Sequence, residues 1–153
     1  MTPFLLIGAA VLGQVALGQA IESPWFVPDV ALSLLVVLIT QMRTRRVALA
    51  VFTACFASLF SVRHPALTAG AYLAVAAGVR MMATVWDLTE PPLQRLAVGL
   101  AEGVWLLACV AGDHGAASTA GLICFRVFLT IICLPFVRPL AGFAAERAGG
   151  THA

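Results

Sequence analysis

The chain has 153 residues, of which 61% are hydrophobic and only 10% are charged. Soluble domains are about half apolar and about a quarter charged, so this composition excludes an ordinary soluble enzyme and predicts an integral membrane protein. The net charge of +2 is too small to indicate a nucleic-acid-binding protein.

The first apolar segment covers residues 3–21. Its length is about the 20 residues that a helix needs to cross a bilayer. No arginine precedes it and no distinct cleavage signature follows, so we expect a retained span, with a cleaved signal peptide as the alternative. Small residues four apart, such as Ala9 and Gly13, would allow close helix packing.

The second segment, residues 28–42, begins with a proline and an acid. Pro28 suits the start of a helix, and Asp29 then falls in the first turn, where a carboxylate faces the positive end of the helix dipole. We therefore interpret Asp29 as a helix-start cap rather than a catalytic acid.

A basic cluster closes the second segment and sets the topology. Its members are Arg43, Arg45 and Arg46. Because cationic residues beside a span resist translocation, this end is expected to stay in the cytoplasm. The remaining apolar segments are residues 47–62, 66–83, 96–111 and 116–137. Six spans would put both termini in the cytoplasm, with seven of the nine arginines on that side and only Arg63 outside.

The pattern predicts one all-α, polytopic transmembrane domain over residues 1–140. No linker is long enough for a second domain, and no repeat is recognisable. Residues 141–153 are polar and glycine-rich, and we expect them to form a short, frayed cytoplasmic tail.

Two ionisable residues, Glu102 and Arg126, fall inside predicted spans. Such residues usually face the interior of a bundle and pair with each other. The fifth and sixth spans are antiparallel neighbours, so contact is feasible. We favour a buried ion pair that fixes helix register, and the alternative is the proton or substrate site of a small transporter.

Other chemistry-bearing residues form no recognisable site. His64, Asp113 and His114 come from separate turns without ligand spacing, so we interpret them as solvated loop residues rather than a metal site. The four cysteines lie in apolar segments without metal or redox spacing and are expected to be small buried packing residues. No catalytic set or phosphate loop is present, so we expect neither an enzyme nor a bound cofactor.

Four stretches carry a family resemblance. They are Pro28-Asp29, the basic turn at 43–46, SLFSVRHPALTAG at 58–70, and LPFVRPL at 134–140. This arrangement resembles the MreD family of bacterial rod shape-determining proteins, which are small polytopic proteins with almost no extramembrane mass. The family commonly has an aspartate near the end of its third span, where Ser58 stands here.

The resemblance implies a non-enzymatic scaffold of the cell-elongation machinery in the bacterial inner membrane. Such a protein binds MreC and positions the peptidoglycan transpeptidase and glycosyltransferase. Its contact surfaces would be helix faces and short turns, and its arginines could touch anionic headgroups. The small residues expected to admit a partner helix are Ala57, Gly70, Ala74, Ala77 and Gly78.

The alternative is the substrate-binding subunit of an energy-coupling-factor vitamin transporter, a six-helix membrane protein whose fold is thought to be similar. Such subunits bind a vitamin in an outward pocket and pack small-residue faces, such as Ala9 and Gly13, against a coupling partner. The predicted outer side of this chain carries few polar groups for a vitamin.

Overall fold

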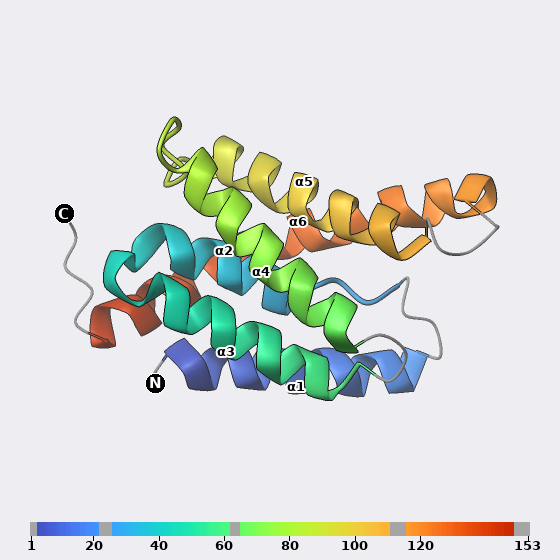
Figure 1. The fold of residues 1–153 in the computed structure, drawn as a ribbon, viewed down its shortest axis with the longest axis horizontal. Coiled ribbons are helices and arrows are strands. Elements are labelled where there is room, and N and C mark those ends of the chain that lie inside the picture. The colour runs from blue at the N-terminus through green and yellow to red at the C-terminus, as the bar shows by residue number, and fades with distance from the viewer. Residues whose placement is uncertain (1–2, 22–25, 62–64, 111–115, 149–153) are drawn as a thin grey trace.

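The computed structural model describes residues 3–21, 26–61, 65–110 and 116–148 (Figure 1). Within these ranges the chain forms six α-helices, one 3-10 turn and short connections, which confirms the predicted all-α bundle. The elements are α1 (Pro3–Ile21), α2 (Val30–Gln41), η2 (Arg43–Arg45), α3 (Arg46–Leu59), α4 (Pro65–Met82), α5 (Pro91–Val110) and α6 (Ala116–Arg147).

Helix α2 forms the centre of the bundle. Every residue from Ala31 to Ile39 is buried, and α2 contacts each of the other five α-helices. Figure 1 shows it enclosed by its neighbours. A helix that is apolar all round must be covered on every side, which explains why this continuous apolar run occupies the core.

Among the described residues, three helical stretches are long and apolar enough to cross a membrane: Pro3–Ile21, Pro65–Met82 and Ala120–Arg147. Helices α2 and α3 have only 12 and 14 residues, fewer than the predicted segments 28–42 and 47–62. Helix α2 is shorter because Asp29 caps its start and the chain leaves the helix at Met42 before η2. Helix α3 starts at Arg46, one residue before the predicted start, and is shorter only because it ends at Leu59. A full set of six spans stays a prediction.

Helix α5 begins at Pro91, several residues before the predicted start at 96. Proline is favoured in the first helical turn because the backbone N–H that it lacks would have no helical partner there. The N–H of Gln94 donates to the carbonyl of Glu90 at 3.0 Å, which starts the helical pattern. The paired prolines therefore open this helix. Further along, α5 packs tightly on α6, since a Cβ at Gly99 would lie 3.1 Å from Cδ1 of Ile131.

Helix α6 continues to Arg147, so the predicted end at 137 and the frayed tail from 141 were wrong for residues up to 147. Its buried stripe carries on past both internal prolines. The stripe comprises Leu134, Val137, Ala141, Ala144 and Ala145. Pro135 and Pro139 lie on the exposed face of the helix. Each proline removes one backbone hydrogen bond, but packing of the opposite face holds the helix together.

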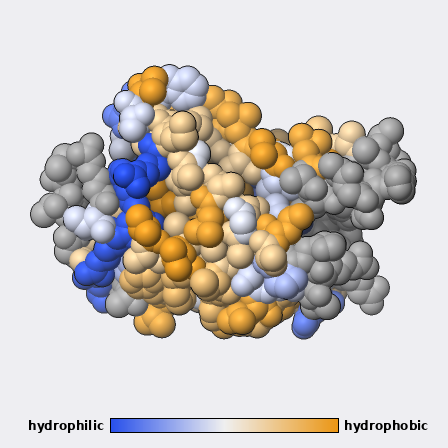
Figure 2. All heavy atoms as spheres, in the orientation of Figure 1, coloured by the Kyte–Doolittle hydropathy of each residue, from blue (hydrophilic) through white to orange (hydrophobic). Residues whose placement is uncertain are grey.

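The arginines gather at one end of the bundle. There α2, α4 and α6 end, η2 lies, and α1, α3 and α5 begin (Figure 1). The arginines on these helix ends and turns are Arg43, Arg45, Arg46, Arg80, Arg95, Arg138 and Arg147. Figure 2 shows a hydrophilic band at this end, with mostly apolar surface over the rest of the face.

Backbone carbonyls anchor two of these arginines. Nε of Arg46 donates to the carbonyl of Ile39 at 2.8 Å, and Nη2 of Arg138 donates to the carbonyl of Thr89 at 2.9 Å. The first bond ties the start of α3 to the end of α2. The second ties α6 to the connection between α4 and α5.

Candidate functional site

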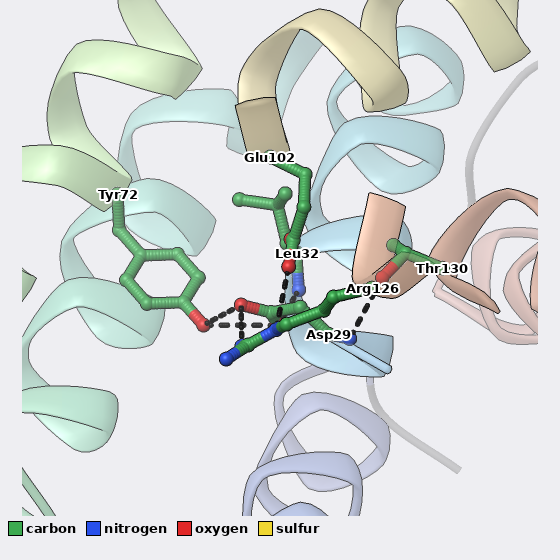
Figure 3. Close-up of polar contacts among 6 residues, drawn as sticks. All are labelled: Asp29, Leu32, Tyr72, Glu102, Arg126 and Thr130. Carbon is green, nitrogen blue, oxygen red and sulfur yellow. Dashed lines mark hydrogen bonds and ion pairs between the residues drawn. The ribbon is translucent and has the colours of Figure 1, made fainter. Parts of the chain in front are cut away.

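A polar cluster lies inside the otherwise apolar bundle (Figure 3). Its members are Asp29 before α2, Tyr72 on α4, Glu102 on α5, and Arg126 and Thr130 on α6. Asp29, Glu102 and Thr130 are almost completely buried, and the Arg126 side chain is 13% exposed. The cluster therefore joins four separate parts of the fold through side chains withdrawn from the surface.

The guanidinium of Arg126 lies between two carboxylates. Its Nε is 2.9 Å from Oε1 of Glu102, and its Nη2 is 3.9 Å from Oδ2 of Asp29. The structure thus brings together the two residues that the sequence paired, and it adds Asp29 as a third charge. An arginine suits this position because its planar fork can face two acceptors at once.

Asp29 makes both a local and a long-range set of contacts. Its Oδ1 accepts the N–H of Leu32 at 2.8 Å, which is the capping bond expected from the sequence. Its own N–H donates to Oγ1 of Thr130 at 3.1 Å, and the hydroxyl of Tyr72 lies 3.1 Å from each carboxylate oxygen. Asp29 is therefore the point at which α2, α4 and α6 are tied together.

The second oxygen of Glu102 is buried and, within the described residues, has no hydrogen-bond partner. Two carboxylates share one guanidinium, so the fully ionised cluster is short of one positive charge. Buried polar atoms are usually paired, and unpaired ones mark sites of function or of stored free energy. This oxygen is the least satisfied atom in the cluster.

A cavity of about 360 Å³, which we call the central cavity, opens beside the cluster. Asp29, Tyr72 and Arg126 form part of its wall. Its other lining side chains with polar or aromatic character are Gln14, Phe60, Ser61, Thr68 and Trp105. The hydroxyl of Thr68 donates to that of Ser61 at 2.8 Å at the α3–α4 side of this cavity. The cavity combines charge, hydroxyl groups and aromatic surface, which a small polar molecule can use for binding.

The small residues expected to contact a partner do not share one face. Gly70, Ala74 and Gly78 line an apolar groove of about 520 Å³ between α4 and α5, which we call the α4–α5 groove. Ala77 lies in a different groove, between α3 and α4, and Ala57 is buried at the central cavity. Sequence spacing identified small residues without showing which helix covers each of them.

Two other predictions concern cysteines and metal ligands. Cys55 and Cys124 are exposed on the helix surface and Cys133 is half-buried, so the expectation of buried packing was wrong for the first two. His64, Asp113 and His114 lie outside the described residues. In the described part of the chain, no group of three or more histidine, cysteine or acidic side chains is placed to hold a metal ion.

The chain matches no protein-family model, no curated protein and no solved structure.

Proposed function

We propose that this protein is a non-enzymatic scaffold of the MreD type in the bacterial inner membrane. In this role it binds an MreC-like protein and positions a cell-wall transpeptidase and glycosyltransferase. The observation that carries the proposal is the α4–α5 groove, an apolar surface rich in small residues on the outside of the bundle.

The groove has the properties of a helix-docking surface. A Cβ built at Gly70 or Gly78 meets no atom within 4 Å, so the groove is open at both positions. In a bilayer, helices associate by close van der Waals packing, which small residues permit. A single transmembrane helix of a partner would therefore fit between α4 and α5, along Gly70, Ala74 and Gly78.

The distribution of charge supports a transmembrane orientation with the arginine-rich end in the cytoplasm. Basic residues are retained on the cytoplasmic side of spans. Helix α1 begins and α6 ends at this same end of the bundle, so both termini would be cytoplasmic (Figure 1). The apolar surface beyond the arginines would then face the hydrocarbon of the bilayer (Figure 2).

A pull-down from native membranes in mild detergent, followed by mass spectrometry, tests the scaffold. The variant Gly78→Leu places an apolar side chain in the groove, at a position where an added Cβ has no neighbour within 4 Å outside its own helix backbone. The matched control is Gly13→Leu on α1, where the same open space exists. We expect wild type and Gly13→Leu to recover an MreC-like protein with a transpeptidase, and Gly78→Leu to recover about tenfold less, a loss of about 1.4 kcal/mol in binding.

Recovery of a coupling subunit with two ATPases would contradict the scaffold and favour a second candidate, the substrate-binding subunit of a vitamin transporter. One observation supports that candidate. The central cavity gathers Asp29, Tyr72, Arg126 and Trp105, which the sequence did not show to be neighbours. A thermal-shift screen of purified protein against water-soluble vitamins would test it, with Tyr72→Phe expected to abolish any shift.

A further inference from the structure

A third concave surface lies between α3 and α4 at the arginine-rich end. It has a volume of about 300 Å³, and we call it the α3–α4 groove. Arg46, the first residue of α3, and Arg80, in the last turn of α4, both line it. The rest of its lining is aliphatic apart from Met81, so the groove is apolar with two basic side chains in its wall.

The apolar side chains of this groove are unusually exposed. Val47 is 65% exposed and Met81 is 72% exposed, and Val51 and Leu73 are exposed as well. They line the same groove as Arg46 and Arg80. Surface of this kind needs hydrocarbon contact, and directly beside it are two cationic side chains.

The arginines are placed to attract an anion. Nε of Arg46 donates to the carbonyl of Ile39, which fixes its guanidinium at the start of α3, where the helix dipole also favours negative charge. Asp87 lines a neighbouring polar pocket that Arg46 also borders, and among the residues that line the α3–α4 groove itself there is no acid. Asp87 accepts hydrogen bonds from the hydroxyl and the backbone N–H of Thr89.

We propose that the α3–α4 groove binds an anionic phospholipid of the cytoplasmic leaflet. The phosphate lies at Arg46 and Arg80, and one acyl chain runs along Val47, Val51 and Leu73. Basic pockets between transmembrane helices on the cytoplasmic side are typical sites for anionic headgroups. A free phosphate would use the two arginines but leave the apolar wall uncovered. This inference needs the chain to lie in a bilayer, and it is independent of the scaffold role.

Native mass spectrometry of the delipidated full chain in detergent tests this site. The protein is titrated with phosphatidylglycerol, with phosphatidylcholine of the same acyl chains, and with inorganic phosphate. We expect phosphatidylglycerol to bind at least fivefold more tightly than phosphatidylcholine, since each cationic side chain near a membrane surface contributes about a fivefold preference for anionic lipid. Inorganic phosphate should neither bind measurably nor displace the lipid.

Two variants probe the two halves of the site, and a third is the control. Arg80→Gln should weaken phosphatidylglycerol about fivefold and leave phosphatidylcholine unchanged. Ala77→Phe fills the apolar part of the groove and should weaken both lipids, because Ala77 is an exposed lining residue. Arg95→Gln removes an exposed arginine from the same end, outside the groove, and should change nothing. Arg46 is left intact because its bond to Ile39 also holds the fold.

Three results would overturn the inference. They are equal affinity for the two lipids, phosphatidylglycerol binding that survives both Arg80→Gln and Ala77→Phe, and displacement of lipid by inorganic phosphate. A failed pull-down with intact lipid selectivity would reject the scaffold alone, so the two proposals fail separately.

Discussion

Charged side chains in the interior of the bundle and those at its arginine-rich end are held in different ways. In the interior, Arg126 faces the carboxylates of Glu102 and Asp29. At the end, Arg46 and Arg138 donate to backbone carbonyls. Ionisable side chains inside a transmembrane bundle usually pair with an opposite charge. At the end, each of these two guanidinium groups donates one hydrogen bond to a backbone carbonyl.

This contrast assigns a separate role to each region. The interior cluster ties the start of α2 to α4, α5 and α6, so it should control whether the bundle holds its shape. The arginines at the end should control orientation and lipid contacts, with a smaller effect on stability. Substitutions in the two regions should therefore differ in size and in what they change.

The largest effect is expected for Arg126→Leu. This change leaves two buried carboxylates without a countercharge, and breaking a buried pair in this way costs about 3–5 kcal/mol. Thermal unfolding in detergent, followed by fluorescence-detected size exclusion, would measure the loss. Arg95→Gln is the control and should change stability by less than about 0.5 kcal/mol. Similar melting of the two variants would remove the distinction between the regions.

Glu102→Gln should have an intermediate effect. The amide keeps the shape of the side chain and can still accept from Arg126, whose second partner Asp29 remains, so we expect a loss of about 1–3 kcal/mol. The same unfolding measurement applies. If proton-coupled transport were found and this variant lost it while melting like wild type, Glu102 would be a transport site rather than part of a structural ion pair.

Tyr72→Phe should cost less, about 0.5–1.5 kcal/mol, because it removes one hydroxyl from Asp29 and leaves the ring in place. The change should lower the melting temperature slightly without altering the oligomeric state or the amount of protein in the membrane. A melting temperature equal to that of wild type would show that the hydroxyl does not stabilise Asp29.

Asp87→Asn should have the smallest effect, and a pH-dependent one. The hydroxyl and then the backbone N–H of Thr89 hold the pKa of Asp87 below its ordinary value of 3.8. A lowered pKa in the folded state stabilises the fold above the ordinary pKa, and this contribution is lost as pH falls through the lowered pKa. Wild type should therefore melt above Asp87→Asn at pH 7, and the difference should vanish once the pH falls below the lowered pKa of Asp87. A difference that persists in acid would assign it to another cause.

The sequence predicted the helical architecture and one contact of the cluster well, because both depend on local pattern. Long apolar runs locate helices, and an acid and a base inside such runs indicate a buried pair. Tyr72 and Thr130 were missed as partners of Asp29 because they lie 43 and 101 residues away along the chain. The only available signals were that Tyr72 is the single tyrosine of the chain and that Thr130 interrupts an apolar run.

The end of α6 shows where local rules fail. Pro135 and Pro139 are typical helix terminators, and the sequence after them is rich in small residues. The helix continues because Ala141, Ala144 and Ala145 pack into the core on the face opposite the prolines. The same limit applies to the small residues on α4, since only the packed structure separates those in the α4–α5 groove from Ala77 in the α3–α4 groove.

The proposed scaffold and the proposed lipid site both require the chain to cross a bilayer with its arginine-rich end in the cytoplasm. Cysteine labelling tests this orientation most directly. The four native cysteines are replaced by alanine, and Thr44→Cys in η2 or His64→Cys between α3 and α4 is introduced. A membrane-impermeant maleimide should label His64→Cys in intact spheroplasts and Thr44→Cys only after permeabilisation. Labelling of Thr44→Cys in intact spheroplasts would contradict the orientation and, with it, the assignment of the arginines to the cytoplasmic surface.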